Sequence, residues 1–324
     1  MKQTIKWGII GCGNVTEVKS GPAYKMTEGF ELVAVMRRNL ELAKDYAQRH
    51  GVDKYFNHAD DLINNDEVDA VYIATPPDTH SHYALKVAEA GKICCIEKPM
   101  APSYEECLAI NAAFEKQNLP LFVAYYRRSL PRFNKVKSLL KEKAIGDIRH
   151  IYWYLSRTAS DLDKSKAYNW RTDAKIASAG YFDDLASHGL DLFIYLLGEI
   201  EEAKGIALNQ QNLYSAKDAI SGSWLHKSGA LGSASWNFGA YKREDRVRII
   251  GSEGELSFSV FLEKPIQLEV SNEQKEFWIE NPKHIQQFHV ENMSKHLGLN
   301  FQHPSTGLTA THTAWVMDKI LGKI

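Results

Sequence analysis

The sequence has no excess of charge of either sign and no long hydrophobic run. Its 324 residues carry 39 Lys and Arg against 40 Asp and Glu, a formal net charge of −1, so charge draws it neither to nucleic acid nor to an anionic membrane. No stretch approaches the ~18 apolar residues of a membrane-spanning helix. The amino terminus lacks the basic, apolar and small-residue regions of a signal peptide. We therefore expect a cytoplasmic protein with no nucleic-acid or membrane partner.

Cysteine is scarce, and its few positions exclude two classes of small domain. The four cysteines, all in the first third, are Cys12, Cys94, Cys95 and Cys107. Their spacing fits neither a metal site nor a disulfide framework, and no cluster of His, Cys and Asp completes a metal site elsewhere. We expect reduced thiols and no bound metal.

The length and the order of elements predict two domains. A chain of 324 residues exceeds what one core usually serves. Strands and helices alternate in the first third, which predicts a Rossmann-type doubly wound parallel sheet in residues 1–124. The expected strands are 5–10, 31–36, 69–75, 93–96 and 121–125, and the expected helices are 40–50, 82–90 and one capped by Ser103.

Residues 125–324 change character, because runs of strands replace the alternation. This pattern predicts an α+β domain with a large, mostly antiparallel open sheet. Its expected strands are 148–157, 202–208, 220–226, 230–238, 247–250, 255–260, 267–270 and 276–279, with helices at 182–197 and 305–321. The sheet face that carries Trp153, Trp224 and Trp236 needs cover, either from helices or from a second subunit.

A glycine turn directly follows the first expected strand. Gly11 and Gly13 begin a G-x-G-x-x-T sequence that ends at Thr16. Such glycines let the backbone turn tightly and approach a pyrophosphate, which the next helix N-terminus holds. An ordinary strand-to-helix turn is the alternative. The position at the start of a strand–helix–strand unit favours a dinucleotide site.

An acidic residue is missing where it would select NAD. A carboxylate at the end of the second strand, roughly 20 residues after the glycines, would bind the ribose hydroxyls of NAD. Arg37 and Arg38 stand there instead. Two guanidinium groups can pair with the 2′-phosphate of NADP, so we expect NADP rather than NAD. A solvated basic pair is the alternative.

A lysine stands at the end of the strand at 93–96, in the sequence Glu97-Lys98-Pro99. Pro99 restricts Lys98 to an extended conformation, at the strand end where parallel sheets bind ligands. A partly buried lysine beside a cationic nicotinamide has a lowered pKa and can exchange protons near neutral pH. A surface lysine is the alternative.

An acid and a histidine share one face of the expected helix at 182–197. Asp184 and His188 are four residues apart, and a carboxylate can orient an imidazole for acid/base work. Asp183 adjoins Asp184, but the spacing favours Asp184. A hydrogen-bonded core histidine is the alternative for His188.

Along essentially its whole length the chain resembles the glucose–fructose oxidoreductase / inositol dehydrogenase (Gfo/Idh/MocA) family. The motifs that carry the resemblance are Gly11-Cys12-Gly13, Ala74-Thr75-Pro76-Pro77 with His80, Glu97-Lys98-Pro99, Tyr125-Tyr126-Arg127-Arg128, Trp170-Arg171 and Gly180…Asp184…His188. The family often has three glycines where this chain has Ser178-Ala179-Gly180, and a glycine where it has Ala186. The resemblance implies a Rossmann domain followed by a domain whose open sheet commonly packs against another subunit.

The resemblance also implies a role for each motif residue. Lys98, Asp184 and His188 would form the catalytic group. The cofactor would be held by Gly11, Cys12, Gly13, Asn14 and Val15 at the pyrophosphate; Arg37 and Arg38 at the adenosine phosphate; Thr75, Pro76 and His80 at the central part; Glu97 and Lys98 at the nicotinamide ribose; and Tyr126, Arg127, Trp170 and Arg171 around it.

The implied activity is NADP-dependent hydride transfer to or from a carbinol or carbonyl carbon of a sugar, cyclic polyol or dihydrodiol. One alternative is an NAD-recycling glycosidase-type enzyme on the same fold, and another is a non-catalytic nucleotide sensor. The loop at 158–169 would face the hydroxylated substrate through Ser160, Asp161, Asp163 and Lys164. We expect a homo-oligomer, a dimer or tetramer, formed through the carboxyl-terminal sheet.

Overall fold

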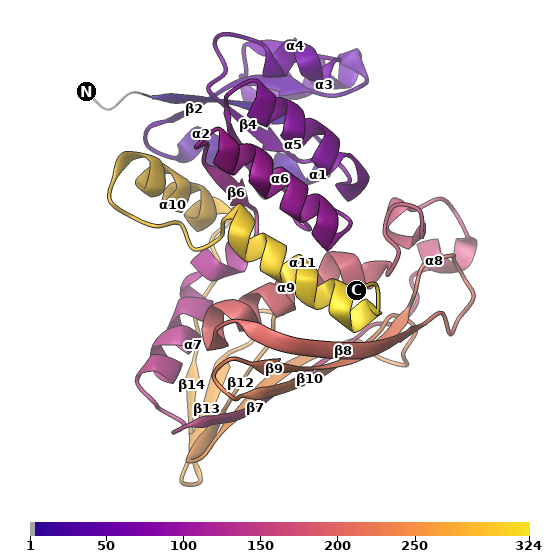
Figure 1. The fold of residues 1–324 in the computed structure, drawn as a ribbon, viewed down its shortest axis with the longest axis vertical. Coiled ribbons are helices and arrows are strands. Elements are labelled where there is room, and N and C mark those ends of the chain that lie inside the picture. Colours follow the sequence, from indigo (N-terminus) through magenta and orange to yellow (C-terminus); the bar gives the residue numbers. More distant parts are fainter. Residues whose placement is uncertain (1–3) are drawn as a thin grey trace. The chain divides into compact units, whose positions relative to one another are not determined.

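A computed structural model describes residues 4–324, and its chain forms two units (Figure 1). The first unit comprises Met1–Ser129 and Pro282–Thr311, and the second comprises Leu130–Asn281 and His312–Ile324. The predicted division after residue 124 places 282–311 in the second domain, whereas its contacts place it in the first. The reason is long-range packing, since Val290 and Met293 join the core around Trp7.

The sheet of the first unit has six parallel strands in the order β3-β2-β1-β4-β5-β6, which confirms the predicted doubly wound fold. The order reverses between β1 and β4, and such sheets bind ligands at the carboxyl ends beside this switch. The strands are β1 (Ile5–Ile10), β2 (Phe30–Met36), β3 (Lys54–Phe56), β4 (Ala70–Ile73), β5 (Ile93–Ile96) and β6 (Leu121–Val123). The helices are α1 (Asn14–Val18), α2 (Gly21–Met26), α3 (Leu40–His50), α4 (Ala59–Ile63), α5 (His80–Glu89), α6 (Tyr104–Lys116) and α10 (Gln287–Gly298).

Aromatic rings fill the core on one side of this sheet. Trp7 on β1 lies 4.9 Å from Tyr24 and 5.2 Å from Phe30 between ring centroids, and Tyr24 stacks on Tyr72 of β4 at 5.0 Å. Each such ring removes a large apolar surface from water. This packing fixes α2 and α10 against the strands that carry the glycine turn and Lys98.

The second unit contains an eight-stranded sheet in the order β14-β13-β12-β11-β7-β10-β9-β8. Only β7 and β10 pair in parallel, so the predicted large, mostly antiparallel sheet is confirmed. Its strands are β7 (Ile148–Ser156), β8 (Ile200–Leu208), β9 (Ala219–His226), β10 (Leu231–Asn237), β11 (Glu244–Gly251), β12 (Gly254–Phe258), β13 (Ile266–Val270) and β14 (Glu273–Phe277). The last strand begins three residues before its predicted start, because Ser271 and Asn272 take positive φ in the preceding turn.

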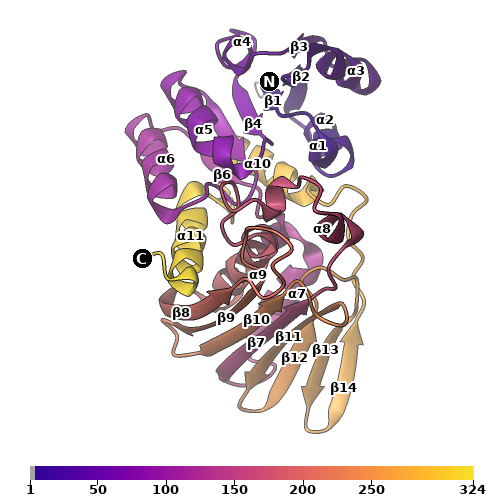
Figure 2. The ribbon, with the colours of Figure 1, turned by 90° about the vertical axis from the view of Figure 1, so that its right-hand side faces the viewer.

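Helix α9 (Tyr181–Leu197) covers one face of this sheet, as Figure 2 shows. Trp153, Trp224 and Trp236 are buried beneath it, and Phe182 meets Trp236 edge-on at 4.9 Å. A helix therefore provides the cover that the tryptophans need. The remaining helices are α7 (Pro131–Lys141), α8 (Asp161–Ser165) and α11 (Gly307–Leu321).

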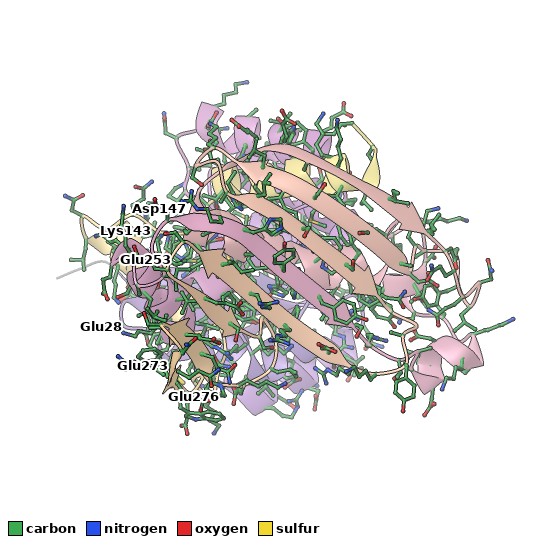
Figure 3. All side chains as sticks on the ribbon, turned by 90° about the horizontal axis from the view of Figure 1, so that it is seen from below. Glu28, Lys143, Asp147, Glu253, Glu273 and Glu276 are labelled. Atoms are coloured by element: carbon green, nitrogen blue, oxygen red, sulfur yellow. The ribbon has the colours of Figure 1, made fainter. Side chains whose placement is uncertain are left out.

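The opposite face of the sheet is open, and Figure 3 looks onto it. No helix of the second unit's described residues lies across that face. Tyr152, Tyr154, Ile206 and Leu231 expose between 41% and 69% of their surface. Apolar side chains on an open sheet commonly mark an interaction surface.

Within residues 4–324, no helix is long and apolar enough to cross a membrane. No group of three His, Cys, Asp or Glu side chains in that range could hold a metal ion. The four cysteines are buried and form no disulfide.

Candidate functional site

The glycine turn lies at the carboxyl end of β1, beside the switch in strand order. Gly11 has a φ of +91°, and a Cβ there would lie 2.9 Å from the backbone of Ala74, so the turn itself requires this glycine. A Cβ at Gly13 would meet only the Gly11 oxygen, at 3.9 Å. The fold therefore leaves space over Gly13, at the start of α1, where Asn14 and Val15 follow.

Arg37 and Arg38 extend from the end of β2, next to this turn. The backbone amides of Gly11 and Cys12 donate to Met36 O at 2.9 and 3.2 Å, which ties the turn to this strand end. Neither arginine side chain forms a hydrogen bond or ion pair with a described residue. The Cys12 thiol is fully buried, and burial raises its pKa to about 11, so it stays neutral.

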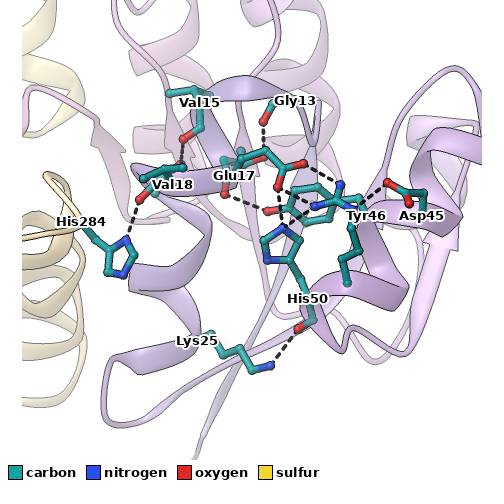
Figure 4. A network of polar contacts seen from close by, with 12 residues as sticks. Gly13, Val15, Glu17, Val18, Lys25, Asp45, Tyr46, His50 and His284 are labelled. Carbon is teal, nitrogen blue, oxygen red and sulfur yellow. Dashed lines mark hydrogen bonds and ion pairs between the residues drawn. The ribbon is translucent and has the colours of Figure 1, made fainter.

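A polar network fixes α1 to α3 directly behind the glycine turn (Figure 4). Both carboxylate oxygens of Glu17 accept from Arg49, at 2.8 and 2.9 Å, and His50 Nε2 lies 2.7 Å from Glu17. The Tyr46 hydroxyl donates to Thr16 O at 2.9 Å. The hydrogen bonds from Arg49 lower the pKa of the Glu17 carboxyl to about 2.

This network predicts a pH dependence of stability. Because the Glu17 pKa falls from 4.5 to about 2 on folding, the unfolded chain binds more protons between those values. Stability from this carboxylate is complete above about pH 4.5 and is lost as the pH falls toward 2. Replacing Glu17 with Gln should lower the free energy of unfolding at pH 7 by about 1 kcal/mol, a value reduced for partial exposure.

Denaturant unfolding measured from pH 7 down to acid is the test. The Glu17→Gln difference should shrink as the pH falls through this window. Glu41→Gln is the control, because Glu41 is exposed on α3 and has no ion pair among the described residues. A Glu17→Gln difference that stays constant with pH would contradict this account.

The loop after β4 is braced to the turn after β5 by His80. Its Nε2 lies 2.8 Å from Thr75 O and its Nδ1 lies 3.0 Å from Pro99 O, and the ring is fully buried. Burial lowers the pKa of His80, and the contacts with the two carbonyl oxygens partly oppose this shift. Thr75 and Pro76 on one loop and Lys98 and Pro99 on the other are thus held to each other.

Glu97 and Lys98 follow β5 directly, as the sequence predicted. The Glu97 side chain is buried, and its Oε1 accepts from the Tyr72 hydroxyl at 2.5 Å and from Gln286 Nε2 at 2.6 Å. Its Oε2 accepts from the backbone amide of Lys98 at 3.2 Å. Neither Tyr72 nor Gln286 was among the residues that the sequence singled out.

Tyr126 and Arg127 follow β6 in a short 3₁₀ turn, Tyr126–Ser129. Both are buried, and the Arg127 guanidinium lies 4.9 Å from the centre of the Tyr126 ring. The predicted cofactor residues of the first unit therefore stand after the carboxyl ends of five of its strands: β1, β2, β4, β5 and β6.

In the second unit, α9 begins at a position that requires glycine. Gly180, its N-cap, has a φ of +62°, and a Cβ there would lie 2.8 Å from Lys217 O. Ala179, at a position where the family often has glycine, is buried. The chain thus lacks two of the three glycines that the family often has here, but it keeps Gly180, whose backbone conformation requires glycine.

The two adjacent acids of α9 do different things. Asp183 Oδ2 accepts at 2.9 Å from the amide of Ala179, which precedes the helix, and burial raises the pKa of the Asp183 carboxyl to about 6. Asp184 Oδ2 accepts from Arg171 Nε at 3.0 Å, and that guanidinium lies 4.3 Å from the centre of the Trp170 ring. Trp170, Arg171 and Asp184 therefore form one connected group.

His188 lies one turn further along α9 and is 5% exposed. Its ring meets Phe261 edge-on at 5.9 Å. The loop of Phe261 is held by the buried Asp245, which accepts from the Phe261 amide at 2.6 Å and from Trp153 Nε1 at 2.9 Å. No local sequence pattern indicates this support, because Asp245 on β11 and the loop of Phe261 meet only in the folded sheet.

Gly189 gives Trp153 room beside His188. A Cβ at Gly189 would lie 2.3 Å from Cζ3 of the Trp153 ring. Gly189→Ala should therefore lower the free energy of unfolding by about 1–3 kcal/mol through overpacking. It should also lower turnover, since α9 must shift with His188. Denaturant unfolding and kcat measured together test this, and unchanged values of both would contradict it.

The loop at 158–169 corrects one expectation. Ser160 and Asp163 form the capping box of α8, and Asp163 also binds Tyr181 OH at 2.6 Å and Arg157 at 3.0 Å. These two side chains therefore have hydrogen-bond partners within the fold, which the sequence did not predict. Asp161 and Lys164 remain exposed.

Family models match both parts of the chain. Residues 5–125 match the oxidoreductase family with an NAD-binding Rossmann fold, and residues 133–257 match the Gfo/Idh/MocA carboxyl-terminal domain. Oxidoreductase P35 of Formosa agariphila is 39% identical over 323 residues, which cover 99% of this chain and 100% of that protein.

A sugar dehydrogenase is among the relatives in both sequence and structure. Levoglucosan dehydrogenase of Pseudarthrobacter phenanthrenivorans is 31% identical over 192 residues, 59% of this chain and 45% of that protein. A solved levoglucosan dehydrogenase, in complex with NADH and levoglucosan, has a TM-score of 0.86 and 22% identity over 98% of this chain and 96% of that one. The chain belongs to the Gfo/Idh/MocA family of oxidoreductases.

Proposed function

We propose that this chain is an NADP-preferring oxidoreductase of a sugar, cyclic polyol or dihydrodiol. The bound nicotinamide supplies or accepts a hydride, which passes to or from a carbinol or carbonyl carbon. The observation that carries the cofactor choice is the unpaired Arg37 and Arg38 at the end of β2, where no acid stands. The levoglucosan enzyme solved with NADH shares 22% identity, so its cofactor does not decide this point.

The first unit supplies the cofactor groups in this proposal. The space over Gly13 and the amides of Asn14 and Val15 suit a pyrophosphate. Arg37 and Arg38 hold the 2′-phosphate by charge-assisted hydrogen bonds. The remaining cofactor residues of the proposal follow the order of the strands: Thr75, Pro76 and His80 after β4; Glu97 and Lys98 after β5; and Tyr126 and Arg127 after β6. The second unit contributes Trp170 and Arg171.

Lys98, Asp184 and His188 carry the proton chemistry. His188 takes the hydroxyl proton when an alcohol is oxidised and returns it when a carbonyl is reduced. Asp184, held by Arg171, orients and stabilises the charged imidazole. Lys98 donates a hydrogen bond to the reacting oxygen and shares the proton.

A sugar-like substrate is supported by the relatives named for levoglucosan. A homo-oligomer is supported by the open sheet face with Tyr152, Tyr154, Ile206 and Leu231. A dimer or tetramer through this face would bury these side chains.

Titration with NADPH and NADH, followed by nicotinamide fluorescence, tests the cofactor assignment. We expect NADPH to bind at least about 10-fold more tightly, which corresponds to one charge-assisted contact of about 1.4 kcal/mol. The double variant Arg37→Ala/Arg38→Ala should lose that preference, whereas Lys44→Ala, an exposed lysine on α3, should keep it. A preference for NADH in the unchanged chain would overturn the assignment.

A further inference from the structure

Glu97, which precedes Lys98 in the turn after β5, is held by two other elements of the first unit. Its Oε1 accepts two short hydrogen bonds, from Tyr72 of β4 and from Gln286 at the start of α10. Burial raises the pKa of Tyr72 well above its ordinary value, so the phenol remains a donor. Since Oε1 already has two donors, the carboxylate is locked in one orientation.

Gln286 can point only one way. Its Nε2 must face the carboxylate, because its own oxygen would repel Glu97. The side-chain oxygen Oε1 then faces the other way, buried and without a hydrogen-bond partner among the described residues. A buried acceptor without a partner destabilises the folded state. Stability alone therefore does not account for an amide here.

The backbone of Gln286 is rigidly placed. Its amide donates to Lys19 O at 3.3 Å, and His284 Nδ1 donates to Val18 O at 2.6 Å, both at the end of α1 (Figure 4). On the other side, α10 is fixed by Val290 and Met293 in the aromatic core. One short segment, 284–286, thus joins the helix after the glycine turn to the acid after β5.

We propose that Gln286 is a positioning residue for Lys98, acting through Glu97. Gln286 and Tyr72 orient the carboxylate, and Glu97 Oε2 accepts from the Lys98 amide and so sets the backbone from which the lysine side chain extends. In this proposal Glu97 connects Gln286 to the backbone of Lys98 and does not itself transfer a proton. The inference rests on the proposed function, because it assigns Lys98 to the reacting oxygen.

The test compares Gln286→Met with Gln287→Met. Methionine keeps the length of glutamine but donates no hydrogen bond. Gln287 is the matched control, since its amide binds Glu291 Oε1 at 2.8 Å within α10. Gln286→Met should lower kcat about 30-fold, as expected for a misplaced catalytic group, while the Kd for NADPH rises no more than about 5-fold. Gln287→Met should match the unchanged chain in both.

A double-variant cycle separates positioning from a general loss of structure. In the Glu97→Gln background, Gln286→Met should cause no further loss of kcat, because the two residues act through one contact. Independent losses that multiply would overturn the proposal. So would a normal kcat in Gln286→Met, or a loss that merely follows the fraction of unfolded protein.

Failure of the proposed function is distinguishable from failure of the positioning role. If the unchanged chain neither reduces a carbonyl sugar with NADPH nor oxidises an alcohol with NADP⁺, the proposed function fails and the positioning role fails with it. If the unchanged chain is active and Gln286→Met keeps its kcat, only the positioning role is overturned.

Discussion

Lys98→Met should reduce turnover by about 10³-fold, the range seen when a positioned acid or base is removed. Methionine has nearly the length of lysine but can neither donate a hydrogen bond nor exchange a proton. The backbone at 98 is fixed by Glu97 and by the His80 brace to Pro99, so the turn should keep its place. The measurement is kcat with NADPH and a reducible sugar, together with the Kd for NADPH.

Lys92→Met provides the matched control for this variant. Lys92 stands just before β5 as Lys98 stands just after it, and its Nζ donates to Asn65 O at 2.7 Å. It should keep its turnover and lose at most some stability. Normal turnover by Lys98→Met would remove Lys98 from the catalytic group.

Asp184→Asn should lower kcat by about 10² or more, because a neutral amide does not stabilise a charged His188. It also removes the charge that pairs with Arg171 at 3.0 Å. The loss should appear in kcat more than in the Kd for NADPH, and steady-state kinetics with a separate NADPH titration distinguishes the two.

Asp183→Asn is the control one residue away. The side-chain oxygen of Asn can still accept from the Ala179 amide, so this hydrogen bond is retained. Its kcat should stay within about 3-fold of the unchanged value, less than the 10²-fold effect of a true acid/base partner. If Asp183→Asn were the inactive variant, the assignment of the two acids would have to be exchanged.

The sequence was sufficient to place those candidate residues that directly follow a strand or share one face of a helix. Glycines after the first strand, arginines after the second and a lysine after the strand at 93–96 were placed at the sheet edge by the parallel topology alone. The prediction that Asp184 rather than Asp183 partners His188 came from helical spacing. In the structure the Asp183 side chain accepts from the Ala179 amide.

Contacts between distant segments could not be predicted. Gln286 and Glu97 are 189 residues apart. The hydrogen bond between Asp245 and the Phe261 amide likewise corresponds to no local sequence pattern. The return of 282–311 to the first unit has the same origin, since it depends on Val290 and Met293 reaching a core formed early in the chain. Ser160 and Asp163 were assigned to a ligand because the sequence of a polar loop does not show which of its side chains will cap a short helix.

The most direct test of the central claim is the stoichiometry of NADPH consumed with a panel of carbonyl sugars, polyols and dihydrodiols. The account predicts that one NADPH is oxidised for each carbonyl reduced, or one NADP⁺ reduced for each alcohol oxidised. Product formed without net change in the nicotinamide, from a cofactor that stays bound, would contradict it and indicate a recycling enzyme.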